Sequence, residues 1–328
     1  MKLGLSLIVV AASLVGPVQT FAADIYFAAN GFGPIHRIDS DSLEVERVFP
    51  AVGGVASAGL AFDSVRNRMV WLGSYAGQDG LFAAAATTFA PELLLSITDG
   101  SIRHPAVDPV TGSVYFEYSQ GIGGRHNPKQ IVRWNAATDS METIVPSVDY
   151  TTAIAIDPIG RWLYWSQNDQ GWPHELLRFP LDGCGGCGAQ LLFEHEFRGP
   201  AGLAVDYQRQ QIHWIGGETT FGQPASSETR LDDFDITVLA SQVYSDDSAV
   251  NLAIDVPSGQ LFMSKLGDID GLYQGGTLPT AYAHWLAIDS EFIVPEPPSI
   301  SLAISGLVVA FLVRRHRSNQ CLREPIEY

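Results

Sequence analysis

Cysteine is scarce in this chain, because its 328 residues contain only three. Two of them, Cys184 and Cys187, share one Gly-rich segment and are able to close a small disulfide in an oxidising compartment. A zinc site with His174 or His195 is the weaker alternative, since two cysteines alone are little evidence for zinc. A thioredoxin-like redox role is excluded, because no strand–helix–strand pattern surrounds the pair.

Basic side chains are also few. Lysine and arginine number 19 against 36 aspartates and glutamates, which gives a net charge of −17. Without the two apolar ends of the chain, the remaining part has a net charge near −20. Such a charge speaks against nucleic acid or an anionic membrane surface as a partner. It leaves a cationic ligand open, and most often it serves only solubility.

The signature motifs of several enzyme classes are missing. The sequence contains no G-x-S-x-G nucleophile elbow, no H-E-x-x-H metal motif and no Gly-rich loop that leads into a helix. The Gly-rich DGCGGCG at 182–188 lies in a hairpin between expected strands, so it does not form a phosphate cradle. The sequence therefore offers no support for covalent catalysis.

What the chain does contain is a repeat. A short apolar segment that ends in aspartate recurs as GLAFD, PAVD, AIAID, GLAVD, NLAID and WLAID. The aspartates are Asp63, Asp108, Asp157, Asp206, Asp255 and Asp289, at intervals of 45, 49, 49, 49 and 34 residues. In the first five copies, five turn-like residues follow, and an apolar triplet such as LYW ends eight residues after the aspartate. So regular a spacing indicates one repeated structural unit.

Each unit is interpreted as a small antiparallel sheet. The apolar segment that ends in aspartate is interpreted as an inner strand buried on both faces. The five turn-like residues form a tight hairpin connection, and the apolar triplet is a second strand. In the fourth copy, ELLRFPLDG and AQLLFEH supply a third and a fourth strand. The sixth segment, WLAID, is not followed by an apolar triplet. An unassigned triplet, Ile25, Tyr26 and Phe27, stands near the start of the chain. We therefore predict an all-β fold, a six-bladed β-propeller of four-stranded blades, closed by pairing of the N-terminal strand with the last blade.

The best-formed copy carries a family resemblance. Within 153–214 the residues GRWLYWSQND, LLRFPLDG and LLFEHEFRGPAGLAVD resemble the YWTD (class B) repeats of low-density lipoprotein receptors, which build six-bladed propellers. Ser166 and Gln167 stand where that family has Thr and Asp. The resemblance implies a protein-binding or scaffolding module and names no ligand. We interpret the aromatic pair Tyr164 and Trp165 as filling the wedge between neighbouring blades.

The start of the chain has the organisation of a secretory signal peptide. Residues 1–22 contain Lys2, an apolar core from Leu3 to Val18 and a small residue at Ala22. We predict cleavage after Ala22 and a propeller over 23–293. The propeller is therefore expected to be exported.

The end of the chain, 294–317, resembles a PEP-CTERM sorting signal, the bacterial C-terminal tag that an exosortase recognises. The matching residues are Val294, Pro295, Glu296 and Pro297, and the basic Arg314, Arg315 and Arg317. Between them we expect a membrane helix at about 299–313, with the arginines and a short tail, 318–328, in the cytoplasm. The resemblance implies an exosortase-type processing enzyme as a partner. It also implies a membrane-anchored protein, or one at the cell surface or in the extracellular matrix after processing.

The repeated aspartates raise the question of a metal site. Propellers of the calcium-dependent lactonase and esterase type hold a metal in the channel with Glu, Asn and Asp, so a hydrolase of that type is the alternative function, with calcium as its cofactor. We favour a structural role, because each aspartate ends an inner strand directly before a turn whose N–H groups can bond to its carboxylate. No acidic residue lies inside any of the six inner strands. We therefore expect no metal and no cofactor.

The connections between second and third strands vary, as SYAGQDG, SQNDQGWPHE and IGGETTFGQPASSET show. Variable loops gathered on one face of a repeat protein indicate its binding face, whereas the uniform first connections leave the opposite face plain. The inner strands begin on the same face as the variable loops. The resulting ligand-contact candidates are Arg103, His104, Arg125, His126, Trp172, His174, Asn251, His284 and Trp285. The alternative, that these are ordinary exposed loop residues, stays open.

These features together predict a non-catalytic binding or scaffold propeller whose ligand is an extracellular protein or glycan.

Overall fold

The computed structural model describes the chain over 24–29, 34–39, 44–49, 59–121, 128–168, 174–183, 187–195, 202–218, 224–230, 236–240, 249–265, 268–271, 276–278 and 283–289. The chain divides into two compact units, Met1–Phe292 and Ile293–Tyr328, and all described residues belong to the first. Every helix or strand that these residues form is a β-strand.

In the described part of the chain, the strands form six antiparallel sheets of four strands each. Sheet 1 consists of β24 (Ala283–Ile288), β1 (Ile25–Ala29), β2 (Ile35–Ile38) and β3 (Val45–Phe49). Sheet 2 consists of β4 (Gly59–Asp63), β5 (Arg68–Tyr75), β6 (Gln78–Ala85) and β7 (Pro91–Ser96). Sheet 3 consists of β8 (Ser101–Val107), β9 (Val114–Ser119), β10 (Lys129–Asn135) and β11 (Ser140–Val148).

The second half of the described chain repeats this order. Sheet 4 consists of β12 (Tyr150–Asp157), β13 (Trp162–Asn168), β14 (His174–Pro180) and β15 (Gln190–His195). Sheet 5 consists of β16 (Gly202–Asp206), β17 (Gln211–Glu218), β18 (Pro224–Arg230) and β19 (Ile236–Ala240). Sheet 6 consists of β20 (Ala249–Asp255), β21 (Gln260–Lys265), β22 (Asp268–Gly271) and β23 (Gly276–Leu278).

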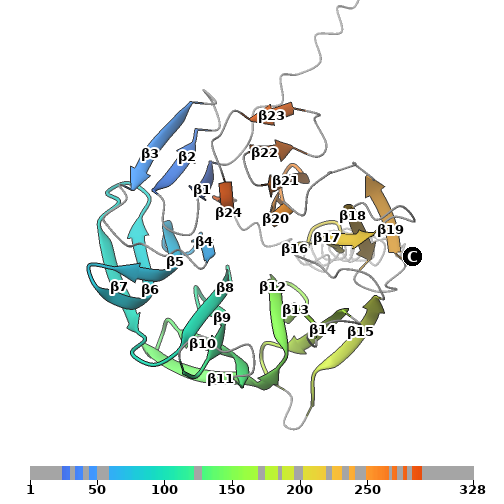
Figure 1. The fold of residues 1–328 in the computed structure, drawn as a ribbon, viewed down its shortest axis with the longest axis horizontal. Coiled ribbons are helices and arrows are strands. Elements are labelled where there is room, and N and C mark those ends of the chain that lie inside the picture. Colours follow the sequence, from blue (N-terminus) through green and yellow to red (C-terminus); the bar gives the residue numbers. More distant parts are fainter. Residues whose placement is uncertain are drawn as a thin grey trace, which may run out of the picture. The chain divides into compact units, whose positions relative to one another are not determined.

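The sheets are arranged as a β-propeller. The inner strand of each sheet contacts the inner strand of the next, in the order β24, β4, β8, β12, β16, β20 and back to β24, so these strands surround a central axis (Figure 1). Because every sheet has the same antiparallel order, all inner strands run in one direction. They begin on the side of the variable connections, which we call the loop face. They end at the first hairpin turns, on the side that we call the turn face.

The two ends of the propeller segment pair with each other, as the unassigned triplet predicts. Strand β1 lies antiparallel to β24, with Ile25 opposite Ile288 and Phe27 opposite Leu286. The amide of Asp289 donates a further hydrogen bond to the carbonyl of Asp24 at 3.0 Å. The closure predicted from the sequence is therefore confirmed, and it makes β1 an interior strand, paired with β24 on one side and with β2 on the other.

The core lies between neighbouring sheets, and the aromatic pair shows how. Tyr164 and Trp165 are each 1% exposed. Because successive residues of a strand point to opposite faces, they enter two different cores. Trp165 packs in a cluster with Tyr115 of sheet 3, whereas Tyr164 packs in one with Trp214 of sheet 5. The prediction that the pair fills the wedges is confirmed, and truncating either side chain to alanine is expected to cost about 3–5 kcal/mol.

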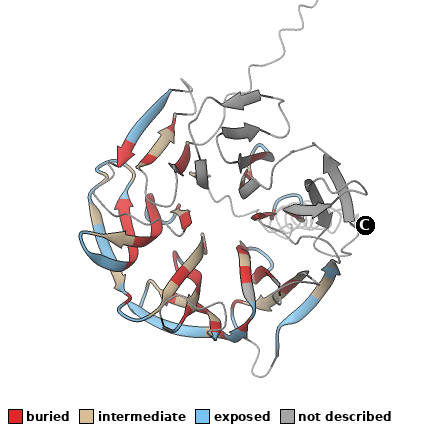
Figure 2. Ribbon diagram, in the orientation of Figure 1, coloured by how far each residue is buried: buried red, intermediate tan, exposed pale blue. Residues whose placement is uncertain are grey.

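Burial decreases from the centre of the ring to its rim. Figure 2 shows mostly buried residues on the second strands and long exposed stretches on the outermost strands. In β5 the six residues from Arg68 to Gly73 are all buried, whereas the six residues of β7 are all partly buried or exposed. The second strand is covered on both faces by neighbouring sheets, and its nearly continuous apolar run reflects this.

The predicted signal peptide 1–22, the predicted sorting signal 294–317 and the predicted tail 318–328 lie outside the described residues. Over the ranges that are described, no helix has the length and apolar character needed to span a bilayer. Cys187 is disulfide-bonded, and Cys184, its predicted partner, lies outside the described residues.

Candidate functional site

On the turn face, hairpin turns join the first and second strands of sheets 2 to 6. We call them the inner turns; they are 64–67, 109–112, 158–161, 207–210 and 256–259. The aspartate before each inner turn is at most 3% exposed. Asp157 shows the common pattern, since its carboxylate accepts hydrogen bonds from the amides of Ile159 and Gly160 at 3.0 and 2.9 Å.

The other copies use the same device. Asp63, Asp108 and Asp206 accept from amides of their own turns, and Asp255 accepts from the hydroxyl of Ser258. Satisfying the turn amides in this way explains why aspartate ends each inner strand. The predicted structural role, acceptance from the amides of the following turn, is confirmed for Asp63, Asp108, Asp157 and Asp206.

The fourth residue of each inner turn has a left-handed backbone. The residues are Asn67, Gly112, Arg161, Gln210 and Gly259, with φ between 49° and 74°. In sheets 2, 4, 5 and 6 the residue after it already belongs to the second strand, as in the pairs Asp157 with Trp162 and Asp255 with Gln260. These four connections are therefore four residues long instead of the predicted five, whereas in sheet 3 strand β8 ends at Val107 and β9 begins at Val114.

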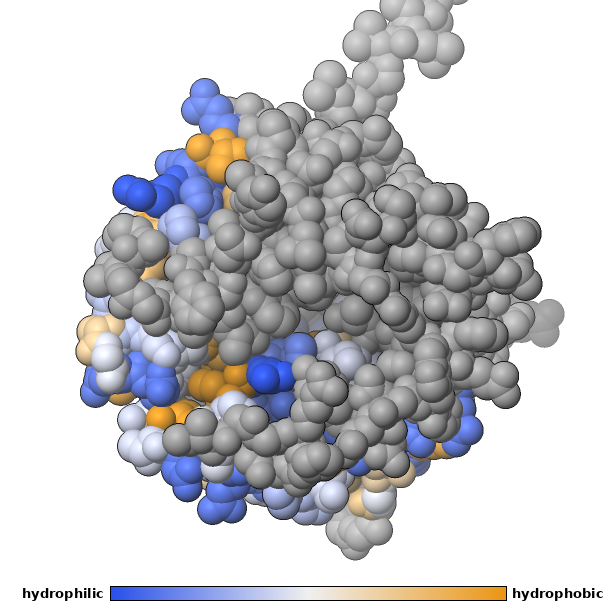
Figure 3. All heavy atoms as spheres, in the orientation of Figure 1, coloured by the Kyte–Doolittle hydropathy of each residue, from blue (hydrophilic) through white to orange (hydrophobic). Residues whose placement is uncertain are grey.

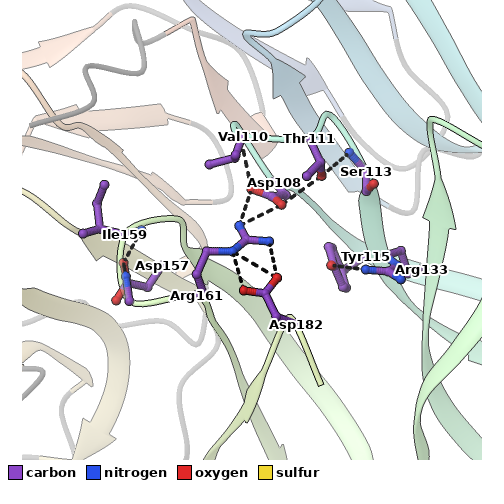
Figure 4. A network of polar contacts seen from close by, with 11 residues as sticks. Asp108, Val110, Thr111, Ser113, Tyr115, Arg133, Asp157, Ile159, Arg161 and Asp182 are labelled. Carbon is purple, nitrogen blue, oxygen red and sulfur yellow. Dashed lines mark hydrogen bonds and ion pairs between the residues drawn. The ribbon is translucent and has the colours of Figure 1, made fainter. Parts of the chain in front are cut away.

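Arginines of the inner turns tie neighbouring sheets together, and Arg161 is the clearest case (Figure 4). Its Nη1 donates to both carboxylate oxygens of Asp108, in sheet 3, at 3.1 and 3.0 Å. Its Nε and Nη2 donate to Asp182, in its own sheet, at 3.0–3.3 Å. Asp108 is fully buried, whereas the Asp182 side chain is 67% exposed. The two carboxylates raise the pKa of Arg161 above its ordinary value, against the effect of burial.

Similar contacts link other sheets. Arg209 bonds to Asp206 at 2.8 Å and to the carbonyl of Val256, in sheet 6, at 2.9 Å. A Cβ atom on Gly259 would lie 2.4 Å from the Arg209 guanidinium carbon, so the absence of a side chain there makes room for the arginine. The connections on the turn face are thus of similar length, while their arginines differ from turn to turn.

A second repeated feature joins the second and third strands. In three sheets a tyrosine lies directly opposite an arginine: Tyr26 and Arg37, Tyr115 and Arg133, and Tyr164 and Arg178. Each arginine forms a side-chain hydrogen bond with its tyrosine. Burial raises the pKa of Tyr164 to about 12, so its hydroxyl stays protonated at neutral pH. The middle residue of the aromatic triplet is thus held by packing and by a polar contact.

Toward the loop face, between sheets 3 and 4, lies a second polar group that we call the Glu117 cluster. Its members are Arg103, His104, Glu117, Lys129 and Thr151. Arg103 lies opposite Glu117 in the ladder of β8 and β9. Lys129 is the first residue of β10, and Thr151 is the second of β12. The cluster therefore gathers the loop-face ends of four strands. In the view of Figure 3, strongly hydrophilic side chains border the hollow at the centre of the ring, next to apolar ones.

Glu117 holds the inner strand of the neighbouring sheet. Its side chain is 1% exposed, and its Oε2 accepts a hydrogen bond from the amide of Thr151 at 3.0 Å. Burial raises the pKa of Glu117, while its hydrogen bonds with Thr151 and the nearby charges of Arg103 and Lys129 oppose that rise. The carboxylate is thereby balanced by two cations of its own sheet.

His104 reaches the same strand from a bulge. The ladder of β8 and β9 shifts register between Arg103 and Ala106, and His104 has φ of 54°. Burial is the main cause that lowers the pKa of His104 to about 4, and a hydrogen bond with the backbone of Thr151 acts in the opposite direction. The imidazole is therefore neutral at pH 7. A left-handed histidine inside an inner strand is a strained arrangement of the kind that often accompanies function.

The polar group continues into sheet 4. Gln167 accepts at its Oε1 from the indole of Trp165 and from the amide of Asp149, at 3.0 and 3.3 Å. Its Nε2 donates to Glu175 at 2.8 Å. Gln167 stands where the YWTD signature has Asp. Its side-chain amide links Trp165, Asp149 and Glu175 by hydrogen bonds.

Only part of the predicted ligand-contact set can be placed. Arg103 and His104 are partly buried within β8, so they are not ordinary exposed loop residues. The backbones of His174, Asn251, His284 and Trp285 lie in β14, β20 and β24. Arg125, His126 and Trp172 lie outside the described residues. The structure thus brings Arg103 and His104 together, and it adds Glu117, Lys129 and Thr151, which sequence reasoning missed.

A signal for Glu117 was present in the sequence. It occupies the place of Ser166 in the repeat, within a strand whose neighbours Tyr115 and Phe116 are apolar. A carboxylate inside such a run has to find a partner when it is buried. Metal ligands were expected only in the inner strands, and Glu117 lies in a second strand.

The chemistry of the cluster is that of a polar anchoring point. Among the residues that the structure describes, no group of three His, Cys, Asp or Glu side chains is arranged to hold a metal ion. Glu117 in β9, and the aspartates at the turn-face ends of the inner strands, already accept hydrogen bonds from the protein. The cluster has the charges to orient an anionic or hydroxyl-bearing group beside Arg103.

Comparisons with known proteins show the fold. No family model and no curated protein matches the chain. A chain of a nidogen/laminin complex is 15% identical, with a TM-score of 0.65, over 81% of this chain and 98% of that one. TolB from Acinetobacter baumannii is 12% identical, with a TM-score of 0.64, over 83% and 68%. The gluconolactonase XC5397 from Xanthomonas campestris is 16% identical, with a TM-score of 0.53, over 71% and 75%. At these identities the likeness establishes a β-propeller and no activity.

Proposed function

We propose that this chain is an exported six-bladed propeller that binds an extracellular protein or glycan through its loop face, without catalysis. Under this proposal a cleaved signal at 1–22 exports it. A PEP-CTERM-like segment at 294–317 then holds it in the membrane, or passes it through an exosortase-type enzyme to the cell surface or matrix. Arg103 and the variable connections around it make the first contacts with the ligand.

The observation that carries the proposal is the engagement of the carboxylates. The five aspartates that precede the inner turns are at most 3% exposed, Glu117 is 1% exposed, and all accept hydrogen bonds from the protein itself. A metal-dependent hydrolase needs carboxylates that are available to the ion. Here they stabilise turns and an inner strand instead. The likeness to a chain of a nidogen/laminin complex, over 98% of that chain, is consistent with a propeller used for association.

The alternative is a calcium-dependent hydrolase of the lactonase or esterase type. The likeness to a gluconolactonase favours it. Metal analysis of the purified full chain, combined with a panel of lactones and esters, separates the two functions. We expect no stoichiometric calcium and no turnover. Calcium at one ion per chain together with lactone hydrolysis would establish the enzyme instead.

The binding face is tested with matched arginine variants. We expect Arg103→Gln to weaken binding of the full chain to immobilised extracellular polysaccharides or matrix proteins by about tenfold or more, the loss of one charge-assisted contact. Arg37→Gln removes an arginine whose side chain is 26% exposed and which pairs with Asp24 near the turn face, so it should leave binding unchanged. Equal effects of the two substitutions would contradict a loop-face site.

A further inference from the structure

The turn face carries a repeated apolar feature that the binding proposal does not use. The second residue of the inner turns in sheets 2, 3 and 4 is Val65, Val110 and Ile159, and these side chains are 49%, 49% and 38% exposed. We call them the turn tips. The other large apolar side chains that are exposed in the described chain, Val45, Leu93, Met141 and Leu191, lie one each on four outermost strands.

The turn tips belong to turns that touch one another. Arg66, next to Val65, reaches Gly112 of the following turn, where an added Cβ would lie 1.7 Å from its Nη1. Arg161 reaches back from the turn of Ile159 to Asp108, next to the turn of Val110. Three consecutive turns therefore present their apolar tips on one continuous part of the face.

The charge of this region differs from that of the whole chain. The chain has 36 acidic residues, but the twenty residues of the five inner turns include none, and they include Arg66, Arg161 and Arg209. Three of the aspartates beneath the turns, Asp63, Asp108 and Asp206, are buried and bonded to these arginines. Exposed carboxylates on this face lie farther out, as at Asp182 and Asp139 in the turns of the outer strands.

The chain also leaves the propeller on this face. Asp289 follows β24, and its amide bonds to Asp24, at the same end of the inner strands as the other repeat aspartates. Only residues 290–298 separate it from the apolar segment expected to span the membrane from about residue 299. Nine residues reach at most roughly 30 Å when fully extended. Under the proposed function, this short connection keeps the exit of the chain within about 30 Å of the bilayer.

We propose that the turn face rests on the lipid surface, with Val65, Val110 and Ile159 inserted into the interface and the neighbouring arginines near lipid phosphates. The inference rests on the membrane anchor of the proposed function. Apolar side chains that enter the headgroup boundary, flanked by basic groups, are the elements of interfacial binding. The net charge of −17 and the outer carboxylates disfavour a strongly anionic surface, so the partner is a largely zwitterionic bilayer. The loop face then points away from the membrane, toward an extracellular ligand.

The test uses the full chain in vesicles of phosphatidylethanolamine and phosphatidylcholine. In a Cys321→Ser background, a nitroxide label is attached to Val110→Cys or, as a control, to Met141→Cys; the native side chains are 49% and 41% exposed. We expect the accessibility to oxygen, relative to a water-soluble nickel complex, to be several-fold higher at 110 than at 141. The chain labelled only at position 141 is also measured in detergent-free buffer. High accessibility to nickel there verifies that position 141 faces water.

The outcomes separate the inference from the anchor on which it rests. If the chain does not float with the vesicles, the anchor is wrong and the inference falls with it. If the chain floats while both labels are equally open to nickel, the anchor stands and the membrane-facing turn tips are refuted. A label at 110 that is immobilised and closed to both reagents would show a protein contact at the tips, which also overturns a lipid contact.

Discussion

The contact between Arg161 and Asp108 is expected to be the strongest single tie between sheets 3 and 4 on the turn face. Asp108 is completely buried, and both of its carboxylate oxygens accept from Arg161 at 3.0–3.1 Å. Removing one partner of a buried ion pair costs about 3–5 kcal/mol, because the other charge is left without compensation. Asp108 keeps hydrogen bonds from Val110 and Thr111, and the Arg161 side chain is 25% exposed, so we expect the lower end of that range.

The two carboxylates of Arg161 provide an internal control. Arg161→Gln should lower the free energy of unfolding by about 3 kcal/mol. Asp182→Asn, which breaks the solvent-exposed half of the same network, should lower it by about 1 kcal/mol or less. Arg161→Gly loses the same ion pairs but relieves the left-handed backbone at φ of 59°, which returns about 1 kcal/mol. The predicted order of stability is therefore Asp182→Asn, then Arg161→Gly, then Arg161→Gln.

Urea denaturation followed by tryptophan fluorescence measures these differences, with midpoints compared at equal slope. The double variant Arg161→Gln with Asp108→Asn tests the coupling, since it removes both charges and should recover about 2 kcal/mol relative to the sum of the single changes. If Arg161→Gln and Asp182→Asn were equally stable within about 0.5 kcal/mol, the buried contact would carry no special weight and the reasoning would fail.

Three further predictions concern other parts of the propeller. His213 is 3% exposed, and burial lowers its pKa to about 4. Between pH 6.5 and pH 4 the unfolded chain therefore binds more protons than the folded chain. Stability that is present at pH 7 is lost as the pH falls through this range. The stability of His213→Tyr relative to the native chain should rise by up to about 3 kcal/mol between pH 7 and pH 4 in urea titrations, and no pH dependence of that difference would refute it. Gly59→Ala should cost about 3 kcal/mol because its Cβ would lie 2.0 Å from Pro105, whereas Gly77→Ala, with φ of 79° and open space around it, should cost about 1 kcal/mol; thermal denaturation giving equal losses would contradict the close approach. Tyr164→Phe removes a hydroxyl bonded to Arg178 and should cost about 1 kcal/mol, with near-ultraviolet circular dichroism checking that the wedge packing persists.

The repeat made the architecture accessible from the sequence because it combines local rules. An apolar strand, an aspartate that caps a turn and an aromatic triplet each depend on neighbours within about ten residues, and their constant spacing reports one unit repeated. The unassigned triplet at Ile25 to Phe27 then predicted the closure, and β1 pairs with β24 as expected. The opposite directions of Tyr164 and Trp165 also follow from strand alternation alone.

The candidate site was only partly accessible in the same way. Arg103 and His104 were found because they stand at the entry to an inner strand, but Thr151, the partner of His104, lies 47 residues beyond it. Glu117 was missed because its role depends on an amide of the next sheet, 34 residues away. The turn arginines were missed for the same reason, since Arg161 and Asp108 are 53 residues apart.

The sequence by itself thus determined the repeat unit, the strand order within each unit and the pairing of the chain's two ends, because those depend on local hydrophobic patterning and on a constant period. Only the tertiary structure decided which charged groups meet across neighbouring sheets. It also decided that the apolar turn tips share a face with the exit of the chain. Those contacts depend on the angle between neighbouring sheets, and the residue spacing along the chain does not specify that angle.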